Sequence, residues 1–398
     1  MMTVHRGHLV HMSTGYSLGG TERRLLELFE ALRVEGWRVS LVTLVDGALA
    51  QAAREHGVAV HGLRMRGRWD CGVLRSALKV VSHLRPHVLQ SDAVRSHLVA
   101  RYCAMRLHCP HVSMVATDYW HDPVGEGHWR PLHQFLDLMT SRYSSAYLTA
   151  NTDLANRLRR FGTPPQRIHV IRHGLRWPDP ETLRIETARI RRQWALPPDG
   201  PLVVVVAMLR PQKRIEDVLD AWRSIRETYP RARLAIVGGA YAGQSDYLKR
   251  LHAQAQQWGL TDVLWVGEVN TGSFWCAAAD VVVLPSLSEG IPRVILEAMA
   301  AARPIVATNV PGTREIVEHG VTGLLVDACA PAQLADAIAS LFADPARRSR
   351  MGMAARHRWE QAHRFEQMVD DSLAVYHSLV SQRHAKRGDS AAKVMAPG

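Results

Sequence analysis

Short runs of β-branched and aliphatic residues alternate along the chain with amphipathic stretches of roughly ten to fifteen residues. This alternation is typical of βαβ units, in which parallel strands are joined by crossover helices. Seven runs in the first half predict strands: Gly7–Met12, Arg38–Val45, Val58–Gly62, His87–Gln90, His111–Val115, Ala146–Thr149 and Ile168–Ile171. Six runs in the second half predict strands: Leu202–Ala207, Arg233–Val237, Val263–Val266, Val281–Leu284, Ile305–Thr308 and Gly323–Val326. The chain is therefore predicted to be an α/β protein built on parallel sheets.

Length and proline content predict two domains. The 398 residues are more than twice the usual length of one domain. Five prolines between Arg176 and Pro201 interrupt the rhythm of strands, and the fully apolar run Leu202–Ala207 restarts it as a central parallel strand. Two tandem Rossmann-like, doubly wound domains are the simplest arrangement. The predicted boundaries are residues 1–175 for the first domain, 176–200 for a linker, 201–362 for the second domain, 363–382 for a final helix and 383–398 for a flexible tail.

Composition narrows the class of partner. The net charge is +12, but the basic residues occur as singles and pairs without interleaved aromatic side chains, which argues against nucleic acid. An anionic membrane surface and phosphate-bearing small ligands remain as explanations of the charge. The longest aliphatic run, Leu202–Leu209, is eight residues, short of the roughly 20 needed to span a bilayer. No signal-peptide core is visible and the five cysteines are scattered, so a cytoplasmic location is expected.

A glycine-containing loop follows the first predicted strand. It runs from Ser13 to Thr21, and Gly19 and Gly20 allow its backbone to approach a ligand closely just before the predicted helix Glu22–Glu35. The loop matches neither the dinucleotide fingerprint nor the P-loop pattern. The alternative is a flexible loop in which Thr21 is simply the N-cap.

Two glutamates lie eight residues apart in the second half. Glu289 is predicted in the turn after the strand Val281–Leu284, and Glu297 in the following helix, with Pro292 near its first residue. Each carboxylate can accept hydrogen bonds from vicinal hydroxyls, while the helix N-terminus favours an anionic group between them. This arrangement suits a sugar, a ribose and a diphosphate. The alternative is that both are ordinary acidic residues of a turn and a helix.

These residues resemble a known family. The pattern P-S-x-x-E-G-x-x-x-x-x-L-E-A-M-A around Glu289 and Glu297 is similar to that of the retaining, sugar-nucleotide-dependent glycosyltransferases of family 4, which have the GT-B fold of two Rossmann-like domains. The resemblance extends over nearly the whole chain. Beside this motif, it rests on Gly19-Gly20-Thr21-Glu22, the Lys213 segment, Ile236-Val237-Gly238-Gly239, Val266-Gly267, Pro304-Ile305-Val306-Ala307-Thr308, Pro311-Gly312, Glu315 and Gly320-Val321-Thr322-Gly323-Leu324-Leu325.

The resemblance implies roles for these residues. Glu289, with the amides of Gly290 and Ile291, would contact hydroxyls of the donor sugar, and Glu297 would hold the nucleoside ribose. Lys213 would neutralise the donor diphosphate in place of a metal, and the sequence contains no D-x-D motif. No metal or other cofactor is therefore expected. Gly19 and Gly20 are also expected at the donor. The first domain would take the acceptor, the second the donor, and the final helix would cross back to the first domain.

The sequence departs from the family pattern at three places. Ala207-Met208-Leu209 replaces the usual G-R-L, and Arg210 is the candidate to supply the missing arginine. Pro292 has no N–H to offer a ligand, and Arg293 is the candidate to restore charge there. The catalytic histidine of the family would fall near Ala116 or Thr117. His121 and Asp118 are therefore the catalytic candidates of the first domain.

The expected activity is transfer of a sugar from a nucleoside diphosphate sugar to an acceptor hydroxyl. The enzyme would belong to the hexosyltransferase class. Retention at the anomeric carbon is implied by the resemblance. The products would be surface polysaccharides, glycolipids or glycosylated metabolites. Two alternatives stay open: a sugar-nucleotide epimerase or phosphorylase of the same fold, and a non-catalytic basic binding protein.

The acceptor remains open between two classes. The charge of the first domain suggests peripheral contact with the inner membrane surface and a lipid-linked acceptor, through the amphipathic segments Glu22–Glu35 and Asp70–Arg85. The alternative is a fully soluble enzyme that acts on a small hydroxylated metabolite.

Overall fold

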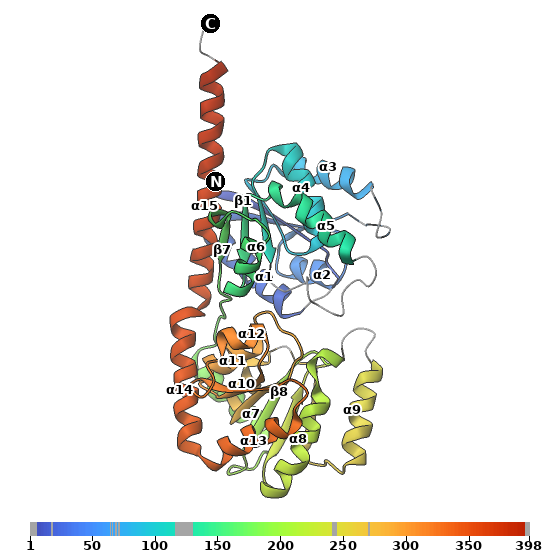
Figure 1. Ribbon diagram of the computed structural model, residues 1–398, viewed down its shortest axis with the longest axis vertical. Coiled ribbons are helices and arrows are strands. Elements are labelled where there is room, and N and C mark those ends of the chain that lie inside the picture. The colour runs from blue at the N-terminus through green and yellow to red at the C-terminus, as the bar shows by residue number, and fades with distance from the viewer. Residues whose placement is uncertain are drawn as a thin grey trace. The chain divides into compact units, whose positions relative to one another are not determined.

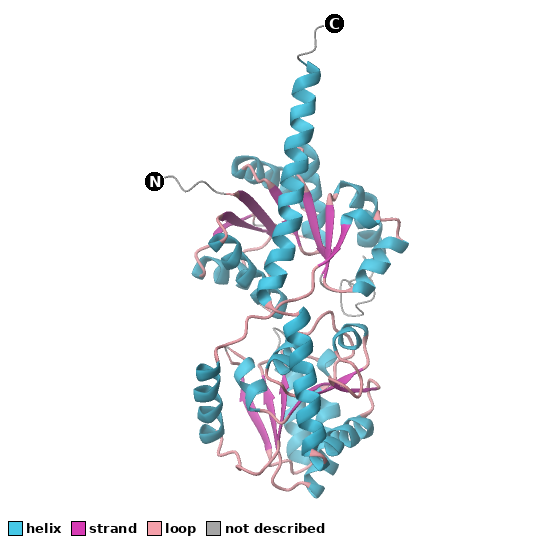
Figure 2. Cartoon of the chain, turned by 90° about the vertical axis from the view of Figure 1, so that its left-hand side faces the viewer, coloured by secondary structure: helices cyan, strands magenta, loops and turns pink. Residues whose placement is uncertain are grey.

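The chain divides into two compact units. A computed structural model describes residues 6–16, 19–63, 65, 67, 70, 72–115, 130–240, 245–269 and 271–394. The first unit comprises Met1–Arg172 with Glu366–Gly398, and the second comprises His173–Phe365. In Figure 2, strands lie between layers of helices in each unit. The predicted α/β class is confirmed, and each of the two units is described below by itself.

The first unit holds seven parallel strands among its described residues, in the order β3-β2-β1-β4-β5-β6-β7. The strands are β1 Gly7–Ser13, β2 Trp37–Thr43, β3 Ala59–Gly62, β4 Val88–Ser91, β5 His111–Val115, β6 Ala146–Thr149 and β7 Ile168–Val170. The helices are α1 Gly20–Val34, α2 Ala48–Glu55, α3 Gly72–Leu84, α4 Val94–Leu107, α5 Arg130–Thr140, α6 Thr152–Arg160 and α15 Phe365–Val394, with the 3₁₀ turns η2 Ser141–Tyr143 and η3 Pro165–Arg167. Figure 1 labels most of these elements.

Side chains of β1 alternate between two helical layers. Val10 and Met12 pack in one apolar cluster with residues of α3 and α4. His11 points to the other face, where its ring meets that of Phe29 of α1 edge-on at 5.5 Å. Tyr376 of α15 is fully buried beside Trp37 of β2, with ring centroids 5.7 Å apart. The final helix is therefore an integral layer of the first unit.

The second unit holds six parallel strands within the part of the chain described, in the order β10-β9-β8-β11-β12-β13. They are β8 Leu202–Val206, β9 Arg233–Val237, β10 Val263–Gly267, β11 Val281–Leu284, β12 Ile305–Thr308 and β13 Gly323–Val326. The helices are α7 Pro180–Gln193, α8 Ile215–Thr228, α9 Ser245–Gln257, α10 Ser273–Ala278, α11 Arg293–Ala300, α12 Pro311–Ile316, α13 Pro331–Ala343 and α14 Pro345–Ala362, with the 3₁₀ turn η4 Pro211–Lys213. Each of the thirteen runs predicted as strands overlaps an observed strand.

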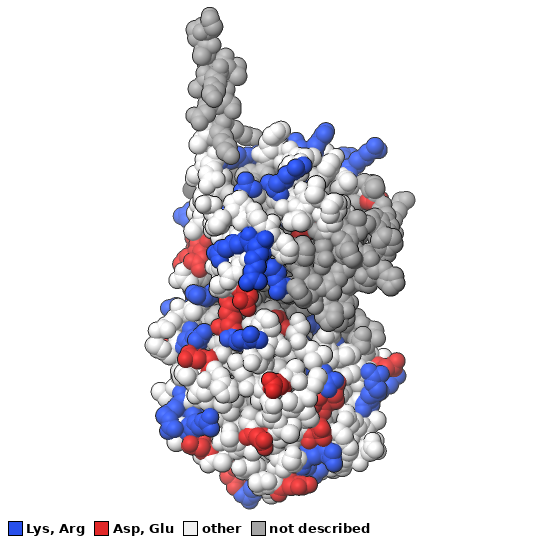
Figure 3. Space-filling view, viewed as in Figure 1, with Lys and Arg blue, Asp and Glu red and all other residues white. Residues whose placement is uncertain are grey.

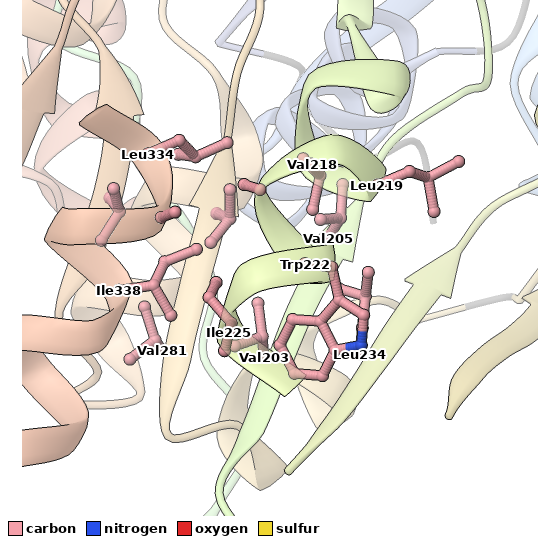
Figure 4. Close-up of a cluster of buried hydrophobic side chains, with 14 of the residues drawn as sticks. Val203, Val205, Val218, Leu219, Trp222, Ile225, Leu234, Val281, Leu334 and Ile338 are labelled. Atoms are coloured by element: carbon pink, nitrogen blue, oxygen red, sulfur yellow. The ribbon is translucent and has the colours of Figure 1, made fainter. Parts of the chain in front are cut away.

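β8 is the central strand that its sequence predicts. Val203 and Val205 pack against α8 and α13, where Trp222 and Ile338 are fully buried (Figure 4). Val204 belongs to the apolar cluster on the opposite face, which includes residues of α10 and α11. Both faces of the strand are covered, which explains why it is apolar at consecutive positions.

The segment 176–200, predicted as a linker, is instead part of the second unit. It contains α7, which starts behind the N-cap Asp179 with Pro180 as its first residue and packs against α10. Ile190 and Leu196 are buried in the core of that unit. The prolines lie on both sides of α7, at positions that suit the ends of a helix. A proline-rich stretch here therefore marks helix ends and not an extended linker.

The C-terminal region also differs from its prediction. α15 begins at Phe365 and continues to Val394, beyond the residues 363–382 predicted for the final helix and through most of the predicted tail 383–398. The first unit ends at Arg172, just before the predicted boundary at 175, because the backbone of Leu175 pairs with His363 and Arg364 of the second unit.

A layer of buried polar side chains lies between α4 and the strands β4 and β5. The Ser91 hydroxyl lies 2.7 Å from His97 Nδ1 and 2.8 Å from His111 Nε2. Burial, followed by the positive charge of Arg101, lowers the pKa of His97 to about 4 and the pKa of His111 well below its usual range. Both imidazoles are therefore neutral in the folded protein at neutral pH.

Acid is expected to destabilise the first unit through these histidines. As the pH falls, the unfolded chain protonates His97 near 6.5 while the folded chain resists until about 4. The free energy of unfolding should be level above about pH 6.5 and should fall by about 3 kcal/mol between pH 6.5 and 4 from His97 alone. Urea unfolding at a series of pH values measures this. His97→Gln should flatten part of the decline, and an unchanged pH dependence in that variant would refute the assignment.

Candidate functional site

The second sheet brings two predicted site residues together at its topological switch point. The strand order reverses between the neighbours β8 and β11, and the carboxyl ends of such strands are where open α/β sheets bind ligands. Lys213 follows β8 and Glu289 follows β11. Their Nζ and Oε1 atoms lie 2.5 Å apart, and both side chains are largely buried. The Leu287 amide donates to the Gln212 carbonyl at 2.9 Å, which ties the two loops together.

The backbone around Lys213 decides which charges meet. Arg210 is extended and half-buried, and it leads into the 3₁₀ turn η4. Arg214, with φ of 48°, ends that turn and pairs with Asp217 at 2.6 Å and with Glu216 at 2.8 Å. The hydrogen bond to Asp217 is the main reason that the pKa of Arg214 is raised. Arg214 is thus directed toward acids of α8, whereas Lys213 is directed toward Glu289.

Glu297 is buried among polar partners of its own. It is the fifth residue of α11 and 5% exposed. Its Oε1 accepts hydrogen bonds from the Ser273 hydroxyl at 3.1 Å and from Arg293 Nε at 3.0 Å. Its Oε2 lies toward Gly272, where a Cβ would be 3.4 Å from Oε2 and 2.7 Å from a methyl of Val206. The backbone at Gly272 therefore packs closely against Val206, and a larger residue there would not fit without a shift.

The turn that carries Glu289 is held by the next strand and helix. The Thr308 hydroxyl of β12 donates to the Ser286 carbonyl at 2.5 Å. At the start of α12, a Cβ on Gly312 would lie 1.6 Å from the carbonyl oxygen of Gly290, so only glycine fits. Within the described chain, the amides of Gly290 and Ile291 make no backbone hydrogen bond outside regular elements. The turn therefore presents both amides near Glu289.

The first unit contains the other predicted candidates. Gly19 is the N-cap of α1, its amide donates to Glu22 Oε2 at 2.8 Å, and Gly20 is the first helical residue. The N-cap is thus Gly19 and not Thr21. His121 and Asp118, the catalytic candidates, lie outside the described residues.

Sequence reasoning missed a buried histidine–aspartate pair at the switch point of the first sheet, between β1 and β4. Asp92 Oδ2 lies 3.3 Å from His11 Nε2. Tyr376 of α15 donates to Gln90 Oε1 at 2.5 Å, and Gln90 Nε2 lies 3.3 Å from His11 Nδ1. Burial acts to raise the pKa of Asp92, but the hydrogen bond and charge of His11 outweigh it and lower that pKa. The place of Asp92 directly after a predicted strand is the signal that could have found it.

The described residues contain no group of three or more His, Cys, Asp or Glu side chains arranged to hold a metal ion. None of the helices they form combines the length and apolar character that a membrane span requires.

Comparison with family models identifies the class of protein that this fold and site define. Residues 18–176 match the model described as Glycosyltransferase Family 4, and residues 186–358 match the model described as Glycosyl transferases group 1. Together the two matches cover most of the chain. The chain belongs to the GT-B glycosyltransferases of these families, as its sequence predicted.

Individual relatives agree with this family. A D-inositol 3-phosphate glycosyltransferase of Xylanimonas cellulosilytica is 34% identical over 50% of this chain and 48% of its own length. Another of that description, from Pseudarthrobacter chlorophenolicus, is 28% identical over 96% of this chain and 95% of its own. A GDP-mannose-dependent alpha-(1-6)-phosphatidylinositol monomannoside mannosyltransferase of Mycobacterium tuberculosis is 36% identical over 45% of this chain and 46% of its own length. The chain thus spans about half the length of several curated relatives that it matches.

A solved structure shows the same fold. Anabaena HepE in complex with UDP superposes with a TM-score of 0.82 at 20% identity, covering 93% of this chain and all of that one. The same protein has also been solved with UDP-glucose, with a TM-score of 0.79.

Proposed function

We propose that the chain is a retaining glycosyltransferase that moves a sugar from a nucleoside diphosphate sugar to an acceptor hydroxyl. The observation that carries this proposal is the Lys213–Glu289 pair at the switch point of the second sheet. When a nucleotide sugar binds there, the lysine can exchange its contact with the glutamate for one with phosphate oxygens. The carboxylate can then accept hydrogen bonds from sugar hydroxyls. UDP and UDP-glucose bound to HepE support this class of donor.

Each residue has a distinct task in this proposal. Lys213, assisted by Arg210, stabilises negative charge on the departing diphosphate, which lowers the barrier to breaking the sugar–phosphate bond. Glu289 accepts hydrogen bonds from sugar hydroxyls, with the amides of Gly290 and Ile291 beside it. Glu297 accepts hydrogen bonds from ribose hydroxyls. Arg293 holds the Glu297 carboxylate through its Nε atom.

The acceptor is proposed from chemistry shared by the relatives. Their names specify D-inositol 3-phosphate and a phosphatidylinositol mannoside, and both are polyols that carry phosphate. We propose a polyhydroxylated acceptor for this chain. In the proposed reaction the acceptor oxygen forms a bond to the anomeric carbon, the bond to the diphosphate breaks, and the acceptor proton leaves with the diphosphate oxygen.

The Glu297 assignment predicts weaker nucleotide binding on its removal. Glu297→Ala deletes an ionised hydrogen-bond acceptor, and we expect a loss of about 1.5–3 kcal/mol in the binding of free UDP, GDP or ADP, whichever the wild type binds. Titration calorimetry measures this. Glu289→Ala should leave nucleotide affinity within a few-fold and lower turnover of the intact donor, because Glu289 faces the sugar.

The control for this experiment is Glu227→Ala. Glu227 is an exposed glutamate of α8 in the same unit. The Glu227→Ala variant should bind the nucleotide as tightly as the wild type does. Equal nucleotide affinity in the wild type and Glu297→Ala would refute the ribose assignment, and failure of the wild type to bind any nucleoside diphosphate would refute the proposed function itself.

A further inference from the structure

One helical stripe of the first unit turns large apolar side chains outward. Phe135, Leu138 and Met139 of α5 and Tyr143 of η2 are 58, 40, 50 and 37% exposed. Their spacing of three, four and eight residues from Phe135 places them along one side of the helix. Among the described residues, thirteen large hydrophobic side chains are exposed, and four of them fall within this stretch of nine. The others are dispersed along the chain, and isolated exposure of that kind is ordinary.

Within the described stretch 135–143, the charged side chain that faces outward is basic. Arg142 is exposed between the apolar side chains, and Arg167 of η3 donates to the carbonyls of Arg142 and Ser144 at 3.3 and 3.4 Å. The carboxylate of Asp137 in α5 points inward, where it meets the buried Arg101 at 2.6 Å. We call the exposed side chains of Phe135, Leu138, Met139, Arg142 and Tyr143 the α5–η2 face. It is apolar and cationic.

The surroundings of the α5–η2 face extend its positive charge. Between Phe135 and Arg172 the sequence has six arginines and two aspartates, a net charge of +4. Three of the arginines, Arg157, Arg159 and Arg160, lie in the last turn of α6. Tyr147 connects the two helices, because its ring packs against Leu154 of α6 and its hydroxyl donates to the Ser141 carbonyl at 2.9 Å. In Figure 3, basic side chains gather where Figure 1 labels α6.

The helices that the sequence suggested for membrane contact point their apolar sides elsewhere. In α1 the apolar side is buried in the unit: Leu25, Leu26, Leu28, Phe29 and Leu32. In α3 the same is true of Val73, Ala77, Val81 and Leu84. These helices are amphipathic because they cover a sheet. Only the solvent-facing apolar stripe on α5 lacks this explanation.

We propose that the α5–η2 face docks on the surface of an anionic lipid bilayer. Phe135, Leu138 and Met139 would enter the boundary between headgroups and acyl chains, while Arg142 and Arg167 meet lipid phosphates. The mixture of aromatic, aliphatic and cationic side chains is complementary to such a lipid interface. A stable protein interface would bury roughly 800 Å² on each partner, and the surface of two helical turns is smaller than that. This surface does not depend on the proposed function.

Vesicle co-sedimentation of the full chain tests the docking surface. The wild type should bind vesicles of equal parts phosphatidylcholine and phosphatidylglycerol at low salt, and should bind less at high salt or to phosphatidylcholine alone. The double variant Leu138→Glu, Met139→Glu should bind the anionic vesicles at least about tenfold more weakly. Arg142→Glu should weaken binding at low salt by several-fold. Circular dichroism verifies that each variant is folded.

The matched control is the double variant Ile185→Glu, Met353→Glu, which adds the same charge at exposed apolar positions of the second unit. It should bind vesicles as the wild type does. The proposal is overturned if the wild type does not bind anionic vesicles at low salt, or if the Leu138 and Met139 variant binds as well as the control. It is also overturned if sedimentation velocity shows a wild-type dimer that this variant abolishes, because the face would then join two copies of the chain.

Discussion

Replacing Lys213 with alanine should lower kcat by roughly 10²–10³-fold, the effect expected from losing one preorganised charge that stabilises a leaving group. Lys213 is held by the Glu289 carboxylate at 2.5 Å and by the short turn η4, so its charge is in position before a donor binds. The reaction is measured as transfer or hydrolysis of the nucleotide sugar, chosen beforehand by a thermal-shift screen of UDP-, GDP- and ADP-sugars, since a donor at 100 times its Kd stabilises by about 2.7 kcal/mol.

Two comparisons make this result specific. Lys249→Ala removes an exposed lysine of α9 in the same unit and should leave kcat unchanged. Lys213→Arg keeps the charge and should lose less activity than the alanine variant. Because the proposed stabiliser is a side chain, activity should survive EDTA. A strict requirement for added Mg²⁺ or Mn²⁺ would contradict this role for Lys213.

The first unit should lose about 3–5 kcal/mol of its free energy of unfolding when Arg101 is replaced by leucine. Arg101 is buried, with 1% of its surface exposed. Its guanidinium donates hydrogen bonds to four described residues: Asp137 and Thr140 through Nη1, Ser113 through Nη2 and Ser144 through Nε. The substitution would leave the Asp137 carboxylate buried without its cation, which is the costly half of breaking a buried ion pair.

A double variant separates lost attraction from the cost of an unpaired charge. Arg101→Leu combined with Asp137→Leu removes both charges and should recover much of the stability. Arg106→Met changes an exposed arginine of the same helix and should alter the free energy of unfolding by less than about 0.5 kcal/mol. Urea unfolding of the full chain provides the measurement. A double variant no more stable than Arg101→Leu would show that the pair is not what Arg101 contributes.

The α5 stripe shows why sequence periodicity could not locate a contact surface. The helices α1, α3 and α5 all carry apolar residues at helical spacing, and this pattern is the same whether the stripe faces a sheet or solvent. Only the packing shows that Leu25 and Val81 are buried, whereas Phe135 and Met139 are exposed. The apolar sides of the two segments that the sequence suggested for membrane contact are therefore buried in the first unit.

The thirteen strands and the parallel class of both sheets follow from local signals in the sequence, whereas the roles predicted for Lys213, Glu289 and Glu297 come from the resemblance of their motifs to a family. Strand runs, turn residues and the E-x7-E spacing are short-range patterns that survive without knowledge of packing. What the tertiary structure alone decided is which of these segments meet. Lys213 and Glu289 are 76 residues apart, and they form a pair only because β8 and β11 are neighbours where the strand order reverses. In the same way, Tyr376 reaches Gln90 across 286 residues because α15 packs on the first unit. Such contacts depend on strand order and on the docking of helices. Both are set by the burial of whole sheet and helix faces, so no single residue in the sequence reveals them.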